Sequence, residues 1–206
     1  MKTKIIVTVF LIVITPLFWT SCDQNQSSES KSASDSTVSK NDYGGYKNEV
    51  EYGKHLVAII GCNDCHTPKI MTPMGPVPDT TLLLSGHPAK IPFSPVNLKE
   101  IEGKGFAVTS DETAWAGPWG ISYADNLTPD ATGVGSWTKE QFFTAIREGK
   151  WKGMKNSREL LPPMPWQDFR LMNDKELSAI FAYLKSIKPI QNIVPPAAPP
   201  VAALHH

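Results

Sequence analysis

Residues 62 to 66 read Cys62-Asn63-Asp64-Cys65-His66, and this pentapeptide constrains the fold more than any other part of the chain. Two thiols three residues apart, followed at once by an imidazole, form the C-x-x-C-H pattern of covalent haem attachment. The thiols can add across the two vinyl groups of one haem, and the histidine is then delivered to the iron. We therefore expect Cys62 and Cys65 to hold one haem c and His66 to be its proximal ligand.

Paired cysteines also occur in redox dithiols and in zinc sites, and the pattern can arise by chance. A redox dithiol is expected near a βαβ pattern, which this sequence lacks. Zinc would need two further ligands, and the remaining histidines do not offer the usual spacings. The haem interpretation is therefore the one that the rest of the chain supports.

The third cysteine, Cys22, follows an export signal. Lys2 and Lys4 precede an apolar core from Ile5 to Ile14, which is shorter than the roughly 18 residues of a spanning helix. Small residues directly before Cys22 resemble a bacterial lipobox, although Trp19 departs from the usual aliphatic residue. We expect residues 1–21 to be a lipoprotein-type signal peptide and Cys22 to be lipidated. The alternative is an ordinary signal peptide that leaves a free thiol.

Composition divides the remainder of the chain into three parts. Residues 22–42 are rich in serine and predict a flexible tether, because they cannot bury enough apolar surface to offset their ordering entropy. Residues 43–194 have the length of one domain. Residues 195–206 form a tail rich in proline and alanine. Without Lys2 and Lys4 the chain has 18 basic and 20 acidic residues, so nothing favours nucleic-acid binding.

The domain reads as helices separated by loops rich in proline and glycine. Asn48 and Asn173 each precede a glutamate by three residues, as in a capping box, and each opens an apolar helical stripe. A third helix is expected from Thr138 to Gly149. Gly53 interrupts the first stripe, which favours a close crossing with the helix that follows Asn173. We therefore predict an all-α domain.

An iron held by His66 needs a ligand on its other face, and a thioether stabilises the ferrous state. Met164 is the best candidate, because it lies in the segment Leu161-Pro162-Pro163-Met164-Pro165-Trp166. Prolines fix φ and so reduce the entropy lost in presenting the sulfur. Met154, His87, His55 or an open sixth site are the alternatives.

The order of motifs along the chain resembles a class I cytochrome c. It is most similar to the cytochrome domains associated with bacterial membrane-bound dehydrogenases. The resemblance covers roughly residues 50 to 195 and implies a cytochrome c-like helical domain, with His66 as proximal ligand and Met164 as axial methionine. Those dehydrogenase subunits often carry three haem motifs, whereas this chain has one. The motifs are C-x-x-C-H, Asn126-Leu127-Thr128-Pro129-Asp130, Gly133-Val134-Gly135-Ser136-Trp137, Pro163-Met164-Pro165 and the helix from Leu177 to Pro189.

The segment from Thr67 to Asp125 is longer than a minimal cytochrome requires and has no helical period. We expect it to be a loop insert that covers the haem edge, or a docking surface or small-ligand gate. Its Trp115 and Trp119 could each direct an indole N–H to a haem propionate. Arg147, Arg158 and Arg170 are further possible partners of the propionates.

Taken together, these features predict an exported, lipid-anchored mono-haem cytochrome c on the periplasmic side of a bacterial membrane. Its role would be electron transfer rather than catalysis, with a dehydrogenase, an oxidase or a quinol-oxidising complex as redox partner. The alternative is a haem enzyme, or a sensor of gas or peroxide, whose sixth coordination site opens.

Overall fold

The structure, a computed structural model, describes residues 43–201 and residue 203. The chain divides into two units, Met1–Thr37 and Val38–His206, and every described residue belongs to the second. The predicted signal peptide, Cys22 and the predicted tether lie outside the described residues. The domain boundaries proposed from composition therefore stay predictions.

Three helices begin at the caps that the sequence predicts. Asn48 accepts a hydrogen bond from the backbone N–H of Glu51 at the start of α1, and full capping boxes open α4 at Thr138 and α6 at Asn173. These caps satisfy N–H groups that a helix start leaves unpaired. The helices are α1 (Glu49–Ile59), α2 (Cys62–His66), α3 (Leu98–Lys104), α4 (Lys139–Arg147), α5 (Trp166–Phe169) and α6 (Asp174–Ser186), with short 3-10 turns η1 (Thr80–Leu82) and η2 (Trp151–Gly153).

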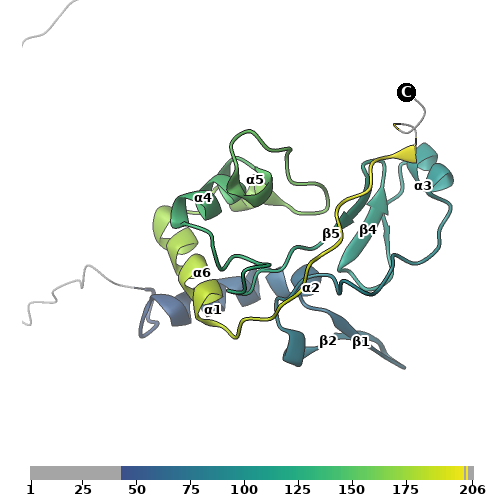
Figure 1. Cartoon of the computed structure of the whole chain (residues 1–206). Coiled ribbons are helices and arrows are strands. Elements are labelled where there is room, and N and C mark those ends of the chain that lie inside the picture. Colours follow the sequence, from purple (N-terminus) through teal and green to yellow (C-terminus); the bar gives the residue numbers. More distant parts are fainter. Residues whose placement is uncertain (1–42, 202, 204–206) are drawn as a thin grey trace, which may run out of the picture. The chain divides into compact units, whose positions relative to one another are not determined.

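The core forms where α1 crosses α6 (Figure 1). A Cβ atom at Gly53 would lie 1.8 Å from the backbone oxygen of Ala179, so glycine is needed for the two helices to approach this closely. The sequence prediction of a crossing at Gly53 is confirmed. Buried apolar side chains from both helices, from α4 and from two loops make up the core: Leu56, Val57, Leu84, Val134, Phe142, Leu177, Ala179, Ile180, Tyr183 and Leu184.

The prediction of a purely all-α domain is wrong, because the insert from Thr67 to Asp125 contains two small antiparallel sheets. One is a hairpin of β1 (Lys69–Thr72) and β2 (Gly75–Pro78), and the other has the order β3 (Val108–Thr109), β4 (Ala114–Gly117), β5 (Gly120–Tyr123). None of these strands exceeds four residues. Such short strands give too little alternation for a sequence pattern to reveal them.

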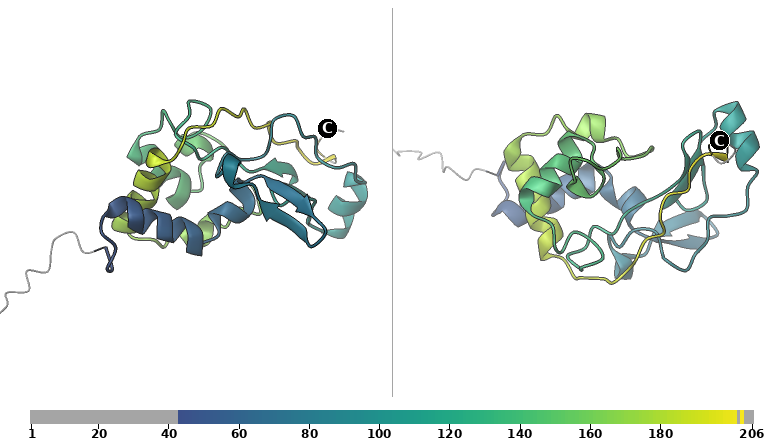
Figure 2. Two further views of the ribbon diagram at one scale, coloured as in Figure 1. Left: turned by 90° about the horizontal axis from the view of Figure 1, so that it is seen from below. Right: turned by 45° about the horizontal axis from the view of Figure 1, so that its top comes forward.

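The C-terminal segment from Pro189 to Pro200 is extended and follows the insert (Figures 1 and 2). The Asn192 side-chain amide donates to the backbone oxygens of Ser85 and His87, at 2.7 and 2.8 Å. Ala198 and Ile121 exchange two backbone hydrogen bonds, both of 2.9 Å. The described part of the predicted tail is therefore bonded to the strands of the insert.

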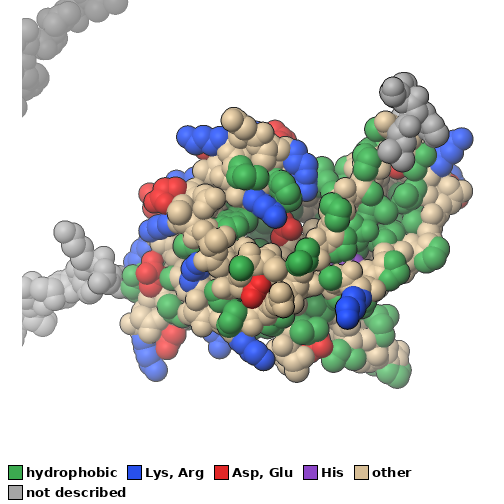
Figure 3. Space-filling model, viewed as in Figure 1, with side chains coloured by type: hydrophobic (Ala, Val, Ile, Leu, Met, Phe, Trp, Pro, Cys, Tyr) green, Lys and Arg blue, Asp and Glu red, His purple; other side chains and the backbone are tan. Residues whose placement is uncertain are grey.

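Side chains differ between the two sides of the view in Figure 3. Lysine, arginine, aspartate and glutamate gather over the helical part, whereas apolar side chains gather over the β3–β5 sheet. None of the helices between Tyr43 and Val201 has the length and hydropathy of a membrane-spanning segment.

Candidate functional site

The C-x-x-C-H pentapeptide forms a helix of its own. Gly61, with φ of 75°, separates α1 from α2 by adopting the left-handed conformation that glycine tolerates without strain. Cys62 and Cys65 are three residues apart on α2, so their side chains share one face of the helix. Both thiols are free, and both line the same cavity as His66.

A backbone carbonyl orients the His66 imidazole. The Nδ1 atom of His66 lies 2.7 Å from the backbone oxygen of Asp125. A carbonyl can only accept, so Nδ1 carries the proton and the Nε2 lone pair is left for a ligand or metal. Burial lowers the pKa of His66, which favours the neutral imidazole. This tautomer is the one that iron coordination through Nε2 requires.

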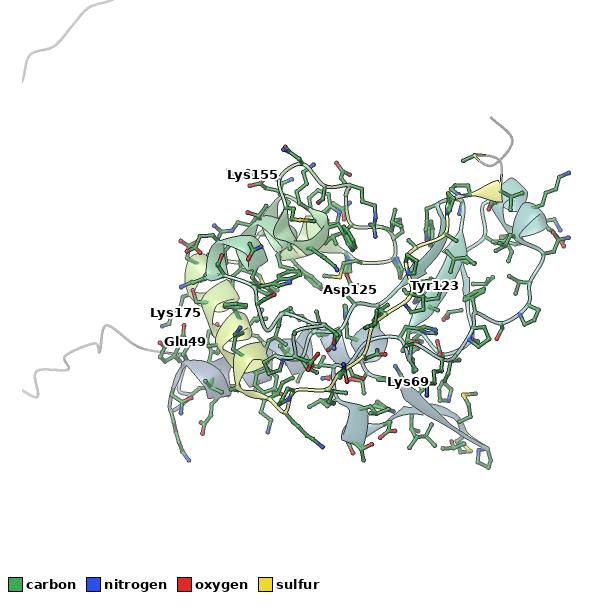
Figure 4. All side chains as sticks on the ribbon, in the orientation of Figure 1. Glu49, Lys69, Tyr123, Asp125, Lys155 and Lys175 are labelled. Atoms are coloured by element: carbon green, nitrogen blue, oxygen red, sulfur yellow. The ribbon has the colours of Figure 1, made fainter. Side chains whose placement is uncertain are left out.

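Lys69 holds the C-terminal end of α2. Its Nζ donates to the backbone oxygens of Asp64 and Thr67, at 2.5 and 2.9 Å, and lies 3.5 Å from a carboxylate oxygen of Glu112. A cation at this end of a helix donates hydrogen bonds to carbonyls that would otherwise be unpaired. Its positive charge also interacts favourably with the negative end of the helix dipole. Lys69 thereby joins the cysteine helix to the insert (Figure 4).

The two thiols do not have the electrostatics of a reactive redox dithiol. Burial raises the pKa of Cys62 to about 12, and burial also raises the pKa of Cys65. A reactive dithiol needs a readily formed thiolate, for which the pKa is lowered. Among the described residues, no three His, Cys, Asp or Glu side chains are grouped so that they could hold a metal ion.

A cavity of about 780 Å³ lies next to α2. Cys62, Cys65 and His66 line it from one element, and Met164 lines it from the loop before α5. Most of its remaining lining is apolar, which makes it suitable for a large flat organic group. The apolar lining includes Trp115, Leu127, Val134, Phe142, Ala145, Ile146, Leu177, Ile180, Leu184, Ile193 and Val194.

The methionines of the described residues fall into two groups, those that line the cavity and those that do not. Met164 and Met172 line it, whereas Met71, Met74 and Met154 do not and are exposed. Met172 also packs against the core. The structure thus brings Met164 together with Cys62, Cys65 and His66, and places Met154 elsewhere.

The two alternative histidines are engaged away from the cavity. His87 is buried, with Nδ1 2.7 Å from the Thr113 hydroxyl and Nε2 2.7 Å from the Ile91 backbone oxygen. His55 stacks on Tyr46, with ring centroids 4.7 Å apart. Neither histidine lines the cavity.

Two cationic side chains, Lys152 and Arg158, contribute positive charge to the cavity. Both line it, and both lie over the ring of Trp151, at 4.7 and 5.0 Å from the ring centroid. Neither forms an ion pair with the described residues within 4.0 Å. Burial lowers the pKa of Arg158, which remains charged at neutral pH all the same. These two cations offer a place for carboxylates at the edge of an apolar group.

The other arginines considered from sequence do not line the cavity. Arg147 pairs with Asp174 at 2.5 Å, and Arg170 lies over the ring of Trp166. The indole N–H of Trp115 donates to the Glu112 backbone oxygen at 2.8 Å. The indoles of Trp115 and Trp119 therefore both bond within the insert rather than presenting an unpaired N–H.

Sequence reasoning did not identify Asp125, Lys69 or Lys152 as parts of this site. Asp125 bonds to His66 through its backbone oxygen, an atom that every residue has. Burial raises the pKa of its carboxyl, which interacts with His66, Lys152 and Arg158. The only hint in the sequence was that Asp125 directly precedes the Asn126-Leu127-Thr128-Pro129-Asp130 motif. In Figure 4, Asp125 lies between the helical part and the strands of the insert.

Comparison with known proteins relates part of the chain to dehydrogenase subunits. It is 39% identical over 79 residues to a subunit of nicotinate dehydrogenase from Pseudomonas putida, a match that covers 38% of this chain and 6% of that protein. It is 36% identical over 69 residues to the gluconate 2-dehydrogenase cytochrome c subunit of Pantoea cypripedii, covering 33% and 15%. It is 32% identical over 88 residues to the fructose dehydrogenase cytochrome subunit of Gluconobacter japonicus, covering 42% and 16%.

The chain is thus similar to cytochrome c subunits of bacterial dehydrogenases, although it spans less than a fifth of the length of these relatives. No protein-family model matches it.

Proposed function

We propose that the chain is a class I, mono-haem cytochrome c that carries single electrons. Cys62 and Cys65 would hold the haem covalently, His66 would be its proximal ligand, and Met164 would bind the opposite face of the iron. One observation supports this proposal above the others. Two elements about 100 residues apart in sequence place these four side chains around one apolar cavity.

The thiol spacing, the His66 tautomer, the volume and the charge of the cavity all fit a haem. The thiols are spaced for two vinyl groups, and the His66 tautomer presents Nε2. The volume lies within the range of about 300–1,000 Å³ that ligand sites span. Lys152 and Arg158 add positive charge for the propionates. When bound, the haem would supply a reversible one-electron couple.

The protein's own residues would tune that couple. The Asp125 carbonyl holds the His66 proton on Nδ1, which strengthens Nε2 as a donor. The apolar walls exclude water, and a thioether from Met164 would favour the ferrous state. None of these roles involves bond making in a substrate, and they suit electron transfer.

Similarity to cytochrome subunits supports a dehydrogenase as the redox partner. An oxidase or a quinol-oxidising complex would serve as the other partner of a carrier. We further propose that the protein is exported and anchored through a lipidated Cys22 on the periplasmic side of a bacterial membrane. The sequence around Cys22 is the support for that part of the proposal.

The test compares Met164→Ala with Met154→Ala and Met172→Ala in the haem-loaded protein. The oxidised wild type should show the weak far-red absorption of a thioether–iron(III) bond. Met164→Ala should remove that band and lower the reduction potential by on the order of 0.1 V or more, within the span of about 0.8 V that axial ligation covers. Spectroelectrochemistry measures both.

Met154→Ala is the matched control, because Met154 is exposed and outside the cavity. It should leave the band and the potential unchanged. If Met172→Ala loses the band and Met164→Ala keeps it, Met172 is the iron ligand instead of Met164. Rapid carbon monoxide binding by the reduced wild type would instead favour a ligand-binding enzyme or sensor.

A further inference from the structure

The β4–β5 hairpin of the insert is hydrogen-bonded to the loop that carries Met164. The Ser122 hydroxyl, on β5, donates to the backbone oxygen of Pro162 at 2.6 Å. Forty residues separate the two partners, and Ser122 is only 9% exposed. Ser122, Pro162 and Met164 all line the cavity.

The Ser122 hydroxyl is itself oriented by a second hydrogen bond. The indole N–H of Trp119 donates to the Ser122 oxygen at 3.1 Å. Because that oxygen is engaged as an acceptor, its proton is directed to Pro162, and the two bonds polarise each other. The Trp119 ring is fixed by packing, since a Cβ atom at Gly117 would meet ring atoms at 2.5 Å.

The Met164 loop has few hydrogen-bond donors of its own. Pro162, Pro163 and Pro165 lack a backbone N–H, and the N–H of Met164 reaches the Leu161 oxygen at 3.3 Å, within the same turn. Proline limits the conformations of the loop but does not attach it to the rest of the protein. A hydrogen bond that attaches the loop must therefore be donated by another segment. The Ser122 hydroxyl donates one to Pro162, which lies two residues before Met164.

We infer that Ser122 is a positioning residue for Met164, with Trp119 behind it. The Trp119–Ser122–Pro162 chain holds the loop against the cavity, so that the sulfur stays in place for the iron. This gives the β4–β5 part of the insert a role in axial ligation. The inference rests on the proposed His66 and Met164 ligation.

The experiment measures how readily imidazole replaces the methionine in the oxidised, haem-loaded full chain. Imidazole binds only when the Met164 loop releases the iron, so its apparent affinity reports the population of released loop. Ser122→Ala should raise that affinity by about 3- to 10-fold, the loss expected for one hydrogen bond. Ser122→Thr, which keeps the hydroxyl, should stay close to the wild type, and Trp119→Phe should change it in the direction of Ser122→Ala.

Ser186→Ala is the matched control. The Ser186 hydroxyl also donates to a backbone oxygen, that of Tyr183 at 2.8 Å, but this bond lies at the end of α6. Ser186→Ala should leave the imidazole affinity unchanged even if the midpoint of thermal unfolding falls. An unchanged affinity in Ser122→Ala, or an equal rise in Ser186→Ala, would overturn the positioning role.

The far-red band of the wild type separates this inference from the proposed function. If the band is present and Ser122→Ala does not loosen the ligand, the positioning role alone is wrong. If the wild type lacks the band, methionine ligation is wrong and the positioning role fails with it.

Discussion

Among single residues, Thr132 links two separate segments of the chain next to the cavity. Its hydroxyl donates to the Asp130 carboxylate at 2.6 Å and accepts from the Asn126 side-chain amide and the Asn192 backbone N–H, at 3.1 and 3.0 Å. Thr132 therefore joins the turn after Asn126 to the C-terminal segment. The hydrogen bonds from Thr132 lower the pKa of Asp130.

This pKa shift predicts a pH dependence for the variant Asp130→Asn. The folded-state pKa lies below the unfolded value of about 3.9, so ionised Asp130 stabilises the fold above about pH 4, and this contribution is lost as the pH falls through the folded-state pKa. The wild type should be the more stable protein at pH 7, and the difference should shrink toward pH 3. Thermal unfolding at both pH values measures it, and a difference independent of pH would refute it.

Residues whose chemistry is unusual could be predicted, and residues that act through the backbone could not. Cysteine and histidine at fixed spacing predicted the part of the cavity lining on α2, and a methionine among prolines predicted a second part of the lining. Asp125 offers a carbonyl that any residue has. Ser122 donates a hydrogen bond to a residue 40 positions away, and no local sequence pattern predicts such a contact.

At the scale of elements, the α1–α6 crossing sets the spacing of the core. Gly53 lets the backbone of one helix meet the backbone of the other, and the buried stripes of both helices close around that point. The end of α1 leads through Gly61 into the cysteine helix. The position of the crossing consequently determines where Cys62 and His66 lie.

Gly53→Ala should therefore destabilise the domain. The added Cβ atom would lie 1.8 Å from the Ala179 oxygen, which forces the helices apart at a cost of about 1–3 kcal/mol or more. Gly103→Ala is the opposite case, because a Cβ atom there meets nothing within 4 Å, and alanine should stabilise α3 by up to about 1 kcal/mol. Denaturant unfolding measures both, and a neutral Gly53→Ala would contradict the close crossing.

Helices were predictable from sequence because their caps and apolar stripes are local signals. The strands were not, because β2 contains Pro76 and Pro78 and β4 is built largely from alanine and glycine. Residues of these types are rare in strands. Their strand conformation depends on the neighbouring strands, and β5, which pairs with β4, also bonds to the C-terminal segment.

At the scale of the whole molecule, the proposed anchor at Cys22 makes a prediction about location. If Cys22 is lipidated, the mature protein should sediment with membranes and carry the mass of more than one acyl chain, because a single chain binds only weakly and reversibly. Cys22→Ser should yield a soluble cytochrome or stall processing. Membrane fractionation and intact mass decide the matter, and a wild-type protein without lipid mass would disprove it.

The C-terminal segment has a consequence for the order in which the cavity can form. Its bonds to the insert close very long loops: Asn192 bonds to residues 105 and 107 positions earlier, and Val201 to Glu102, 99 positions earlier. Contacts so distant in sequence form slowly, because their loop-closure entropy is lost before they contribute. We therefore expect the wall of Ile193 to Ala197, which lines the cavity, to close it late in folding, after the thiols of α2 have been made. During that interval we expect the thiols of α2 to be accessible to a large rigid ligand, before the last wall is in place.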